Sequence, residues 1–186
     1  IRMGVVVEKK LNYQNKKYYE FSESKFYSEL MDLYLSYKCR FAISTGTGWE
    51  VMPAFIFKKP MLFTNFIPYL GAFTASENFF FLFKKYKLIK KNEYLDFNKI
   101  FDLEMKFETG NFDKSVICFE DNNKYELLSA IEKFTKYLEF GTYEENRTEK
   151  KFKSLYQKYA SMLMACNLKN TTTLLHNKVK SKFLFH

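Results

Sequence analysis

The residues with the clearest chemical potential form a short glycine-rich segment, Ser44-Thr45-Gly46-Thr47-Gly48. It follows a brief apolar run, Phe41 to Ile43, which is typical of a buried strand. The two glycines let the backbone adopt conformations that other side chains would forbid, so bare amide groups can face an anion. The hydroxyl groups of the serine and the two threonines add hydrogen-bond donors. This composition favours a phosphate-binding turn.

The residues after the turn, Trp49 to Phe57, are predicted to form a short helix. The turn would then lie at a helix N-terminus, where free N–H groups and the helix dipole favour phosphate. A tight connection between a strand and a helix also needs glycine for steric reasons alone, so a purely structural role stays open. No Gly-Lys-Ser/Thr sequence follows the turn, so the P-loop is absent. The GxGxxG fingerprint is also absent, because Glu50 and Val51 follow Gly48. Nucleotide hydrolysis and hydride transfer therefore lose support.

Asn65 is a second candidate binding residue. It follows the predicted strand Pro60 to Thr64, whose continuous apolar character fits a parallel strand covered on both faces. Ligands of open α/β sheets bind outside the carboxyl ends of the strands, which would put Asn65 beside the glycine-rich turn. The alternative is an asparagine that only caps the loop.

A longer pattern connects these residues within one predicted strand-helix-strand unit, because the turn is followed by Glu50, Ala54, Lys59-Pro60 and Asn65. This pattern resembles bacterial glycosyltransferases of surface polysaccharide biosynthesis, which are related to the GT-B nucleotide-sugar enzymes. The resemblance runs from residue 1 to about residue 140 and includes the segments IRMGVVV, YYEF and SELMDLYLSYKCRFAIS.

The resemblance implies an α/β fold with a Rossmann-like parallel sheet flanked by helices, as in the C-terminal domain of a GT-B enzyme. In such a donor half, Ser44 to Gly48 would hold the diphosphate of a nucleotide-diphosphate sugar, and Glu50 would hold a sugar hydroxyl. The acceptor would be a polysaccharide or lipid-linked precursor. The general base is expected in an N-terminal acceptor domain outside this chain, and no cofactor or obligatory metal is implied.

Two other functions remain open at this stage. One is a nucleotide-sugar epimerase or hydrolase of the same architecture. The other is a noncatalytic module that uses a basic surface on membranes or polyanions, since 30 Lys and Arg against 21 Asp and Glu give a net charge of +9. The lysine pairs are scattered and no nucleic-acid motif organises them, so we expect no nucleic-acid partner but allow peripheral contact with an anionic membrane.

Histidine and cysteine chemistry is not expected. The two histidines, His176 and His186, lie in the last eleven residues, and the three cysteines are far apart with no CxxC spacing. A catalytic Ser-His-Asp set is therefore improbable. No segment resembles a transmembrane helix or a signal peptide, so a cytoplasmic location, with peripheral association with the inner membrane allowed, is the default.

The predicted organisation is a donor-binding α/β domain over residues 1–140 and a C-terminal helical extension over residues 141–186. Ile1 already opens a predicted strand, so we expect the sequence to begin inside a longer protein. The other strands predicted are at 3–7, 18–21, 80–83 and 116–119. The helices predicted are one with Ser24 as its N-cap, one at 97–102 with Asp96 as its N-cap, one from Asn123 and one at 143–166. The first helix should face the sheet with the stripe Phe26, Leu30, Leu33, Tyr34 and Tyr37. The last should pack Phe152, Leu155, Tyr156, Tyr159, Leu163 and Met164 across an interdomain interface, as GT-B proteins do.

Three further groups have a functional and a structural interpretation. Aromatic residues of the 64–78 loop, Phe66, Tyr69 and Phe73, could form a wall for a base or sugar, but packing onto the domain is favoured. Lys84 or Lys85 could touch a phosphate or lie on a solvated basic edge. Asp121 and Asn122 could meet a ribose diol, but helix capping is the stronger explanation.

Overall fold

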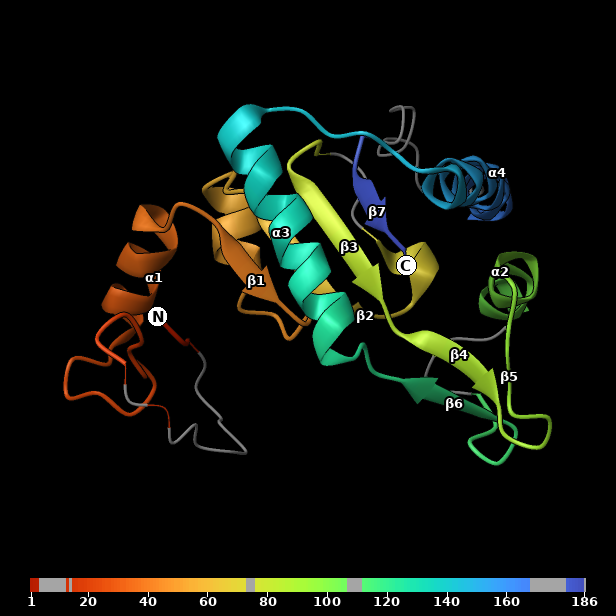
Figure 1. The fold of residues 1–186 in the computed structure, drawn as a ribbon, viewed down its shortest axis with the longest axis horizontal. Helices are drawn as coiled ribbons and strands as arrows, with labels where there is room; N and C mark the ends of the chain where they lie inside the picture. The colour runs from red at the N-terminus through yellow and green to blue at the C-terminus, as the bar shows by residue number, and fades with distance from the viewer. Residues whose placement is uncertain (4–12, 14, 73–75, 107–111, 168–179, 186) are drawn as a thin grey trace.

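The central feature is a four-stranded parallel sheet with helices on both faces (Figure 1). The computed structural model describes residues 1–3, 13, 15–72, 76–106, 112–167 and 180–185. The strand order is β1 (Ala42–Ser44), β2 (Met61–Phe66), β3 (Phe79–Phe83) and β7 (Lys182–Leu184), and all three pairings are parallel. The fold is therefore mixed α/β and compatible with the Rossmann-like sheet predicted from the sequence.

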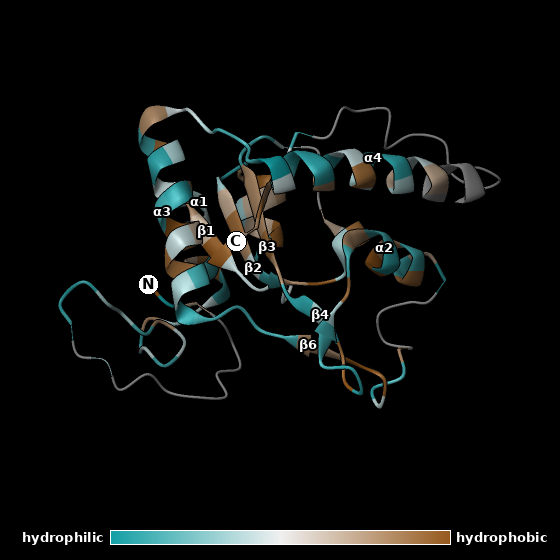
Figure 2. Ribbon diagram, turned by 45° about the vertical axis from the view of Figure 1, so that its right-hand side comes forward, coloured by the Kyte–Doolittle hydropathy of each residue, from teal (hydrophilic) through white to brown (hydrophobic). Residues whose placement is uncertain are grey.

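The two central strands are apolar on both faces because each face is covered. Every residue of β3 is buried, and so are all residues of β2 except Asn65. On one face Leu62 and Phe80 pack against Phe134 of α3 (Lys124–Phe140). On the other face the rings of Phe63 and Phe81 stack, with their centroids 4.8 Å apart. The hydropathy colouring shows this apolar layer between the more polar helices (Figure 2). Such continuous apolar runs are what a doubly covered parallel strand requires.

A smaller antiparallel sheet extends from the carboxyl edge of the main one (Figure 1). Its order is β5 (Glu93–Tyr94), β4 (Lys85–Leu88) and β6 (Ile117–Glu120). The strand predicted at 116–119 is thus confirmed as β6, and its partner is β4. This second sheet builds one wall of the cavity described below.

Two helices cover the face opposite α3. In α2 (Phe97–Lys106), Asp96 caps the N-terminus as predicted, because its Oδ1 accepts a hydrogen bond from the Lys99 N–H at 3.1 Å. In α4 (Arg147–Asn167), Phe152, Tyr156 and Tyr159 are buried in the core that α4 shares with α2 and β7. This part of the predicted stripe therefore packs within the chain and not across an interdomain interface. The side chains of Leu163 and Met164 lie outside the described residues.

The segment expected as a helical extension also supplies a strand. Residues 141–186 contain α4, but Lys182–Leu184 form β7 and pair with Phe80 to Leu82 of β3. Phe183 and Leu184 are buried on opposite faces of the sheet, one in each half of the core. Lys182–Leu184 are thus part of the main sheet, whereas the sequence predicted a helical extension over this segment.

The first helix differs most from the prediction. α1 spans Glu29–Lys38, and its N-cap is Ser28, whose Oγ accepts a hydrogen bond from the Met31 N–H at 3.2 Å. Ser24 is not the cap. The apolar stripe predicted to face the sheet is exposed, and the buried residue of the helix is Ser36.

The beginning of the chain contributes little regular structure among the described residues. Arg2 and Glu20 form an isolated parallel bridge, so the strand predicted at 18–21 is reduced to this contact. Residues 4–7 of the strand predicted at 3–7 lie outside the described residues. The helices of the described part include none that is both long enough and apolar enough to cross a lipid bilayer.

Candidate functional site

The glycine-rich turn directly follows β1 and is closed from inside by Glu50. Ser44 Oγ donates a hydrogen bond to Glu50 Oε2 at 2.9 Å and accepts one from the Gly46 N–H at 3.1 Å. The Gly48 N–H donates to both carboxylate oxygens of Glu50 at 3.0 Å. The Glu50 side chain therefore fills the concave side of the turn and is only 5% exposed.

This arrangement corrects two expectations. The amides of Gly46 and Gly48 bond inward, whereas the sequence predicted that they would face a ligand. Glu50 points into the turn and not toward a sugar hydroxyl. The turn itself stays open to solvent, since Thr45, Gly46, Thr47 and Gly48 are all exposed. Within the described residues, no acceptor is found for the N–H groups of Thr45 and Thr47.

Both glycines of the turn are required by the backbone. Gly46 has φ = 81° and Gly48 has φ = 102°, values that side chains strongly disfavour. A Cβ at Gly46 would also lie 3.2 Å from the ring of Phe66, whereas one at Gly48 would meet nothing within 4 Å. The prediction that these positions need glycine geometry is confirmed. The ring of Phe66, at the end of β2, lies against the turn at Gly46.

The helix predicted at Trp49 to Phe57 is much shorter than expected. A π-helical turn, η1 (Met52–Ile56), replaces it, and the Phe57 N–H bonds to the carbonyl of Met52. So short an element has little macrodipole to offer an anion. The donors of this site are therefore the loop amides and hydroxyls.

Asn65 takes part in a hydrogen-bond network that connects the ends of two strands. It has φ = 51° at a bulge in β2, and its Oδ1 accepts a hydrogen bond from the Asn122 N–H at 2.7 Å. The Asn65 N–H donates in return to Asn122 Oδ1 at 3.2 Å, and Asn122 Nδ2 donates to the carbonyl of Phe83 at 2.9 Å. This network connects the carboxyl ends of β2 and β3 to the start of α3. The loop-capping alternative describes Asn65 better than a ligand contact.

The capping role predicted for Asp121 and Asn122 falls to the next residue. Asn123 caps α3, and Glu126 completes a capping box with it. Asp121 instead forms an ion pair with Lys84, with 2.7 Å between Nζ and Oδ1.

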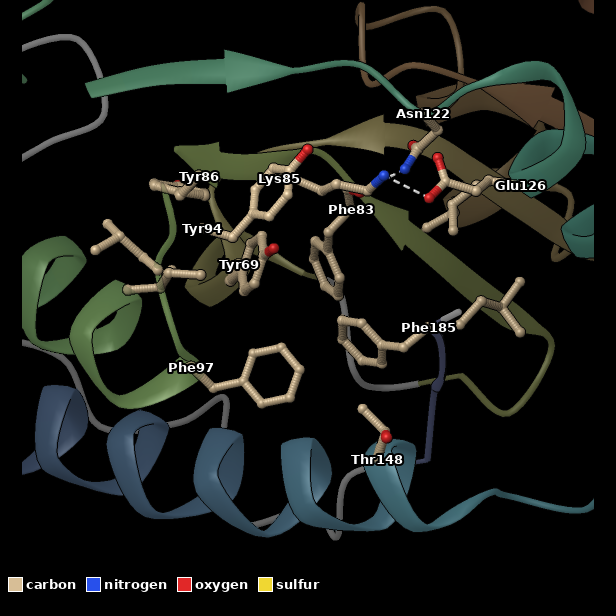
Figure 3. A pocket seen from close by; sticks show the side chains of 14 residues that line it. Tyr69, Phe83, Lys85, Tyr86, Tyr94, Phe97, Asn122, Glu126, Thr148 and Phe185 are labelled. Atoms are coloured by element: carbon tan, nitrogen blue, oxygen red, sulfur yellow. Dashed lines mark hydrogen bonds and ion pairs between the residues drawn. The ribbon is translucent and has the colours of Figure 1, made fainter. Parts of the chain in front are cut away.

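A cavity of about 360 Å³ opens where β3 and β7 end (Figure 3). Figure 3 shows aromatic side chains around it and the ion pair between Lys85 and Glu126 at one end. The residues that line it come from both sheets, from the 3-10 turn at 69–71 and from the starts of α2, α3 and α4 with the segments just before α2 and α3: Tyr69, Leu82, Phe83, Lys85, Tyr86, Tyr94, Leu95, Phe97, Ile100, Asn122, Glu126, Thr148, Leu184 and Phe185. The cavity has an apolar body and a polar end, which is the usual character of a small-molecule site.

Three residues of this cavity have a possible binding role from the sequence, but no sequence pattern brings them together. Tyr69, Lys85 and Asn122 come from separate segments, and their common location depends on the small sheet, which no local pattern predicts. Phe66 and Tyr69 are buried, so the packing interpretation of these aromatics is confirmed. Phe73 lies outside the described residues.

A half-buried carboxylate holds one wall of the cavity in place. Glu104 of α2 accepts hydrogen bonds from the N–H groups of Tyr69 and Leu70, each at 2.8 Å, at the start of η2 (Tyr69–Gly71). The Tyr86 hydroxyl donates to the same carboxylate. Burial raises the pKa of Glu104, and these three hydrogen bonds partly offset the rise. Burial, together with the nearby Glu104, raises the pKa of Tyr69 far above its ordinary value, so this residue acts in the wall as a neutral phenol.

The described part of the chain offers no cluster of three His, Cys, Asp or Glu residues that could hold a metal ion. Comparison with protein families, with curated proteins and with solved structures found no match.

Proposed function

We propose that this chain is the donor-binding half of a GT-B-type glycosyltransferase that moves a sugar from a nucleotide-diphosphate sugar to a bacterial surface polysaccharide precursor. The observation that carries the proposal is that the turn after β1 already coordinates an anion. It holds the Glu50 carboxylate with the Gly48 amide and the Ser44 hydroxyl. Backbone amides and small hydroxyls are also the donors that bind phosphate oxygens in glycine-rich loops.

The topology supports one extended ligand along the carboxyl edge. All four strands of the main sheet are parallel, so the turn after β1 and the cavity after β3 and β7 lie at the same edge. β1 and β7 are three strand spacings apart, about 14 Å. In open α/β sheets this edge is where ligands bind. A diphosphate at the turn and another part of the same nucleotide-sugar in the cavity would use both features.

The chemistry assigned to this half is stabilisation of the leaving group. When the bond between the anomeric carbon and the diphosphate oxygen breaks, the oxygen takes the electron pair and negative charge develops on the diphosphate. Prearranged amides and hydroxyls offset such charge and can supply the largest catalytic contribution in a site from which water is excluded. Thr45 and Thr47 provide exposed hydroxyls for this role. The acceptor and its general base belong to another domain.

Glu50 sets the condition under which the turn can accept a diphosphate. Its carboxylate occupies the donors that a phosphate would use, and two negative charges in one turn repel each other. Binding therefore requires Glu50 to leave the turn or to share its donors. A nucleotide should be bound weakly by the resting turn and more tightly when the carboxylate is replaced by an uncharged side chain.

Calorimetric titration of the chain with uridine, guanosine and cytidine diphosphates tests the proposal. Saturable binding of one of them, with inorganic sulfate much weaker, is the expected result. Heat signals no larger than that of sulfate for all three would overturn it and favour the noncatalytic polyanion-binding alternative. Product analysis with the enzyme that contains this chain then separates sugar transfer from epimerisation or hydrolysis.

A further inference from the structure

One face of α1 exposes a continuous row of large apolar side chains. Leu30, Leu33, Tyr34 and Tyr37 follow the spacing i, i+3, i+4 and i+7, which places them on one side of the helix. All four are exposed, Leu30 to 74% and Tyr37 to 52%. Phe26, just before the helix, is exposed as well. These five residues are called the α1 face below.

The helix leaves four of its six large apolar or aromatic side chains exposed, and its inner side is partly polar. Its inner side buries Ser36, whose hydroxyl has no hydrogen-bond partner among the described residues, and half-buries Met31 and Leu35. Asp32 is half-buried on the same side, and its pKa is raised chiefly by burial. A surface helix normally turns its apolar stripe to the core and its polar side to water. The α1 face is therefore a surface suited to a partner outside the described residues.

Lysine ammonium groups accompany each aromatic ring of the α1 face. Lys25 Nζ lies 5.2 Å from the ring centroid of Phe26. Lys38 Nζ lies 5.3 Å from the centroid of Tyr37 and 6.0 Å from that of Tyr34. Lys59, from the segment before β2, adds a fourth contact at 5.5 Å from Tyr37. The exposed acidic residue of the helix is Glu29, at its first position.

The combination of exposed aromatic residues and neighbouring lysines on the α1 face favours one kind of partner over another. Protein-protein interfaces are enriched in aromatic residues but depleted in lysine at their cores. Helices that lie on membranes combine both, since Tyr, Phe and Leu enter the headgroup boundary while lysines meet anionic lipid phosphates. We propose that the α1 face binds the surface of an anionic lipid bilayer. The net charge of +9 favours the same partner. This inference does not depend on the proposed function.

Vesicle co-sedimentation of the full chain tests the inference. Vesicles of equal parts phosphatidylcholine and phosphatidylglycerol should bind the chain, and binding should weaken as salt increases. Pure phosphatidylcholine should bind much less. The double variant Leu30→Ser/Tyr34→Ser should bind at least about tenfold more weakly, because two inserted side chains are lost. The single variant Lys38→Gln should bind about fivefold more weakly to the anionic vesicles.

The matched control lies on α3. Leu128→Ser/Tyr125→Ser removes the same two residue types from positions that are also exposed, 47% and 80%. This variant should sediment with the vesicles as the wild type does. Circular dichroism checks that both double variants are folded, which their exposed positions predict.

Three results would overturn the inference. The first is that the wild-type chain fails to sediment with anionic vesicles. The second is that the α1 and α3 double variants lose the same amount of vesicle affinity. The third is that the α1 double variant binds the vesicles as well as the wild type. A concentration-dependent dimer that the α1 variant abolishes, without vesicle binding by the wild type, would assign the face to a second copy of the chain instead.

Discussion

Ser44 Oγ and Glu50 Oε2 lie 2.9 Å apart across the turn that follows β1. A hydroxyl at the end of a strand and a carboxylate six residues later thus close the glycine-rich turn from its concave side. The same carboxylate accepts the Gly48 N–H. The turn is therefore organised around an anion before any ligand arrives, and the identity of that anion decides how the site can work.

The first prediction concerns the charge of this internal anion. Glu50→Gln keeps a carbonyl oxygen for the Gly48 N–H but removes the negative charge that competes with phosphate. We expect affinity for a nucleoside diphosphate to rise about tenfold, the effect of removing roughly 1.4 kcal/mol of repulsion. Calorimetric titration measures the change. Unaltered or weaker binding in a folded Glu50→Gln chain would show that the carboxylate does not compete with the ligand.

The second prediction concerns the coupling of Asn65 and Asn122. Their side chains exchange hydrogen bonds with each other's backbone N–H groups, so either alanine variant leaves buried polar groups unpaired. We expect each to lower the free energy of unfolding by about 2 kcal/mol. The double variant should cost clearly less than the sum, because both changes remove one network.

Asn123→Ala provides the control for that cycle. It removes the neighbouring helix cap, at a cost of about 1 kcal/mol, without touching Asn65. Its effect should therefore add to that of Asn65→Ala. Urea unfolding measures the wild type, the three single variants and the 65/122 and 65/123 double variants, and full additivity between positions 65 and 122 is the outcome that contradicts the network.

The third prediction is a pH dependence that originates at Glu104. Burial raises the pKa of this carboxyl in the folded chain above its value in the unfolded chain. The group therefore stabilises the fold fully below the unfolded pKa, and this contribution is lost as pH rises through the folded pKa. Glu104→Gln cannot titrate. The difference in unfolding free energy between wild type and Glu104→Gln should be larger at acid pH than at neutral pH, and a difference that grows with pH would contradict the assignment.

The fourth prediction tests the layer between α3 and the sheet. Phe134 is fully buried and its ring lies 5.2 Å from that of Phe80. Phe134→Ala should lower the free energy of unfolding by about 3 to 5 kcal/mol. Phe140 lies in the last turn of the same helix and is exposed, so Phe140→Ala should change it by less than about 0.5 kcal/mol. Thermal or denaturant unfolding distinguishes the two, and equal effects would contradict the packing.

The sequence predicted the parts of the fold whose signals are local. β2 and β3 are continuous apolar runs, and Asp96, Asn123 and Gly141 mark helix ends by their own hydrogen-bonding or backbone chemistry. β7 was not predicted from the sequence, because three residues after a polar segment give no periodic pattern. Its assignment depends on pairing with β3, a contact between residues about a hundred positions apart.

The residue types of the candidate site could be predicted from the sequence, but the directions in which its side chains point could not. Glycine at 46 and 48 signals unusual backbone geometry, and the positive φ values bear this out. No pattern in the sequence tells whether Glu50 turns inward or outward. Periodicity likewise identified the residues that share one side of α1, but it cannot tell which side of a helix is covered. The cavity is lined by six separate segments of the chain, so no local sequence signal could predict it.

The most direct test of the account compares two glycine variants in nucleotide binding. Gly48 and Gly141 both have positive φ, and a Cβ at either would meet nothing within 4 Å, so valine imposes similar backbone strain at both. Only Gly48 belongs to the turn. The account predicts that Gly48→Val abolishes calorimetric binding of a nucleoside diphosphate, whereas Gly141→Val keeps wild-type affinity below its own unfolding temperature. Undiminished binding by a folded Gly48→Val chain would contradict a diphosphate site at this turn.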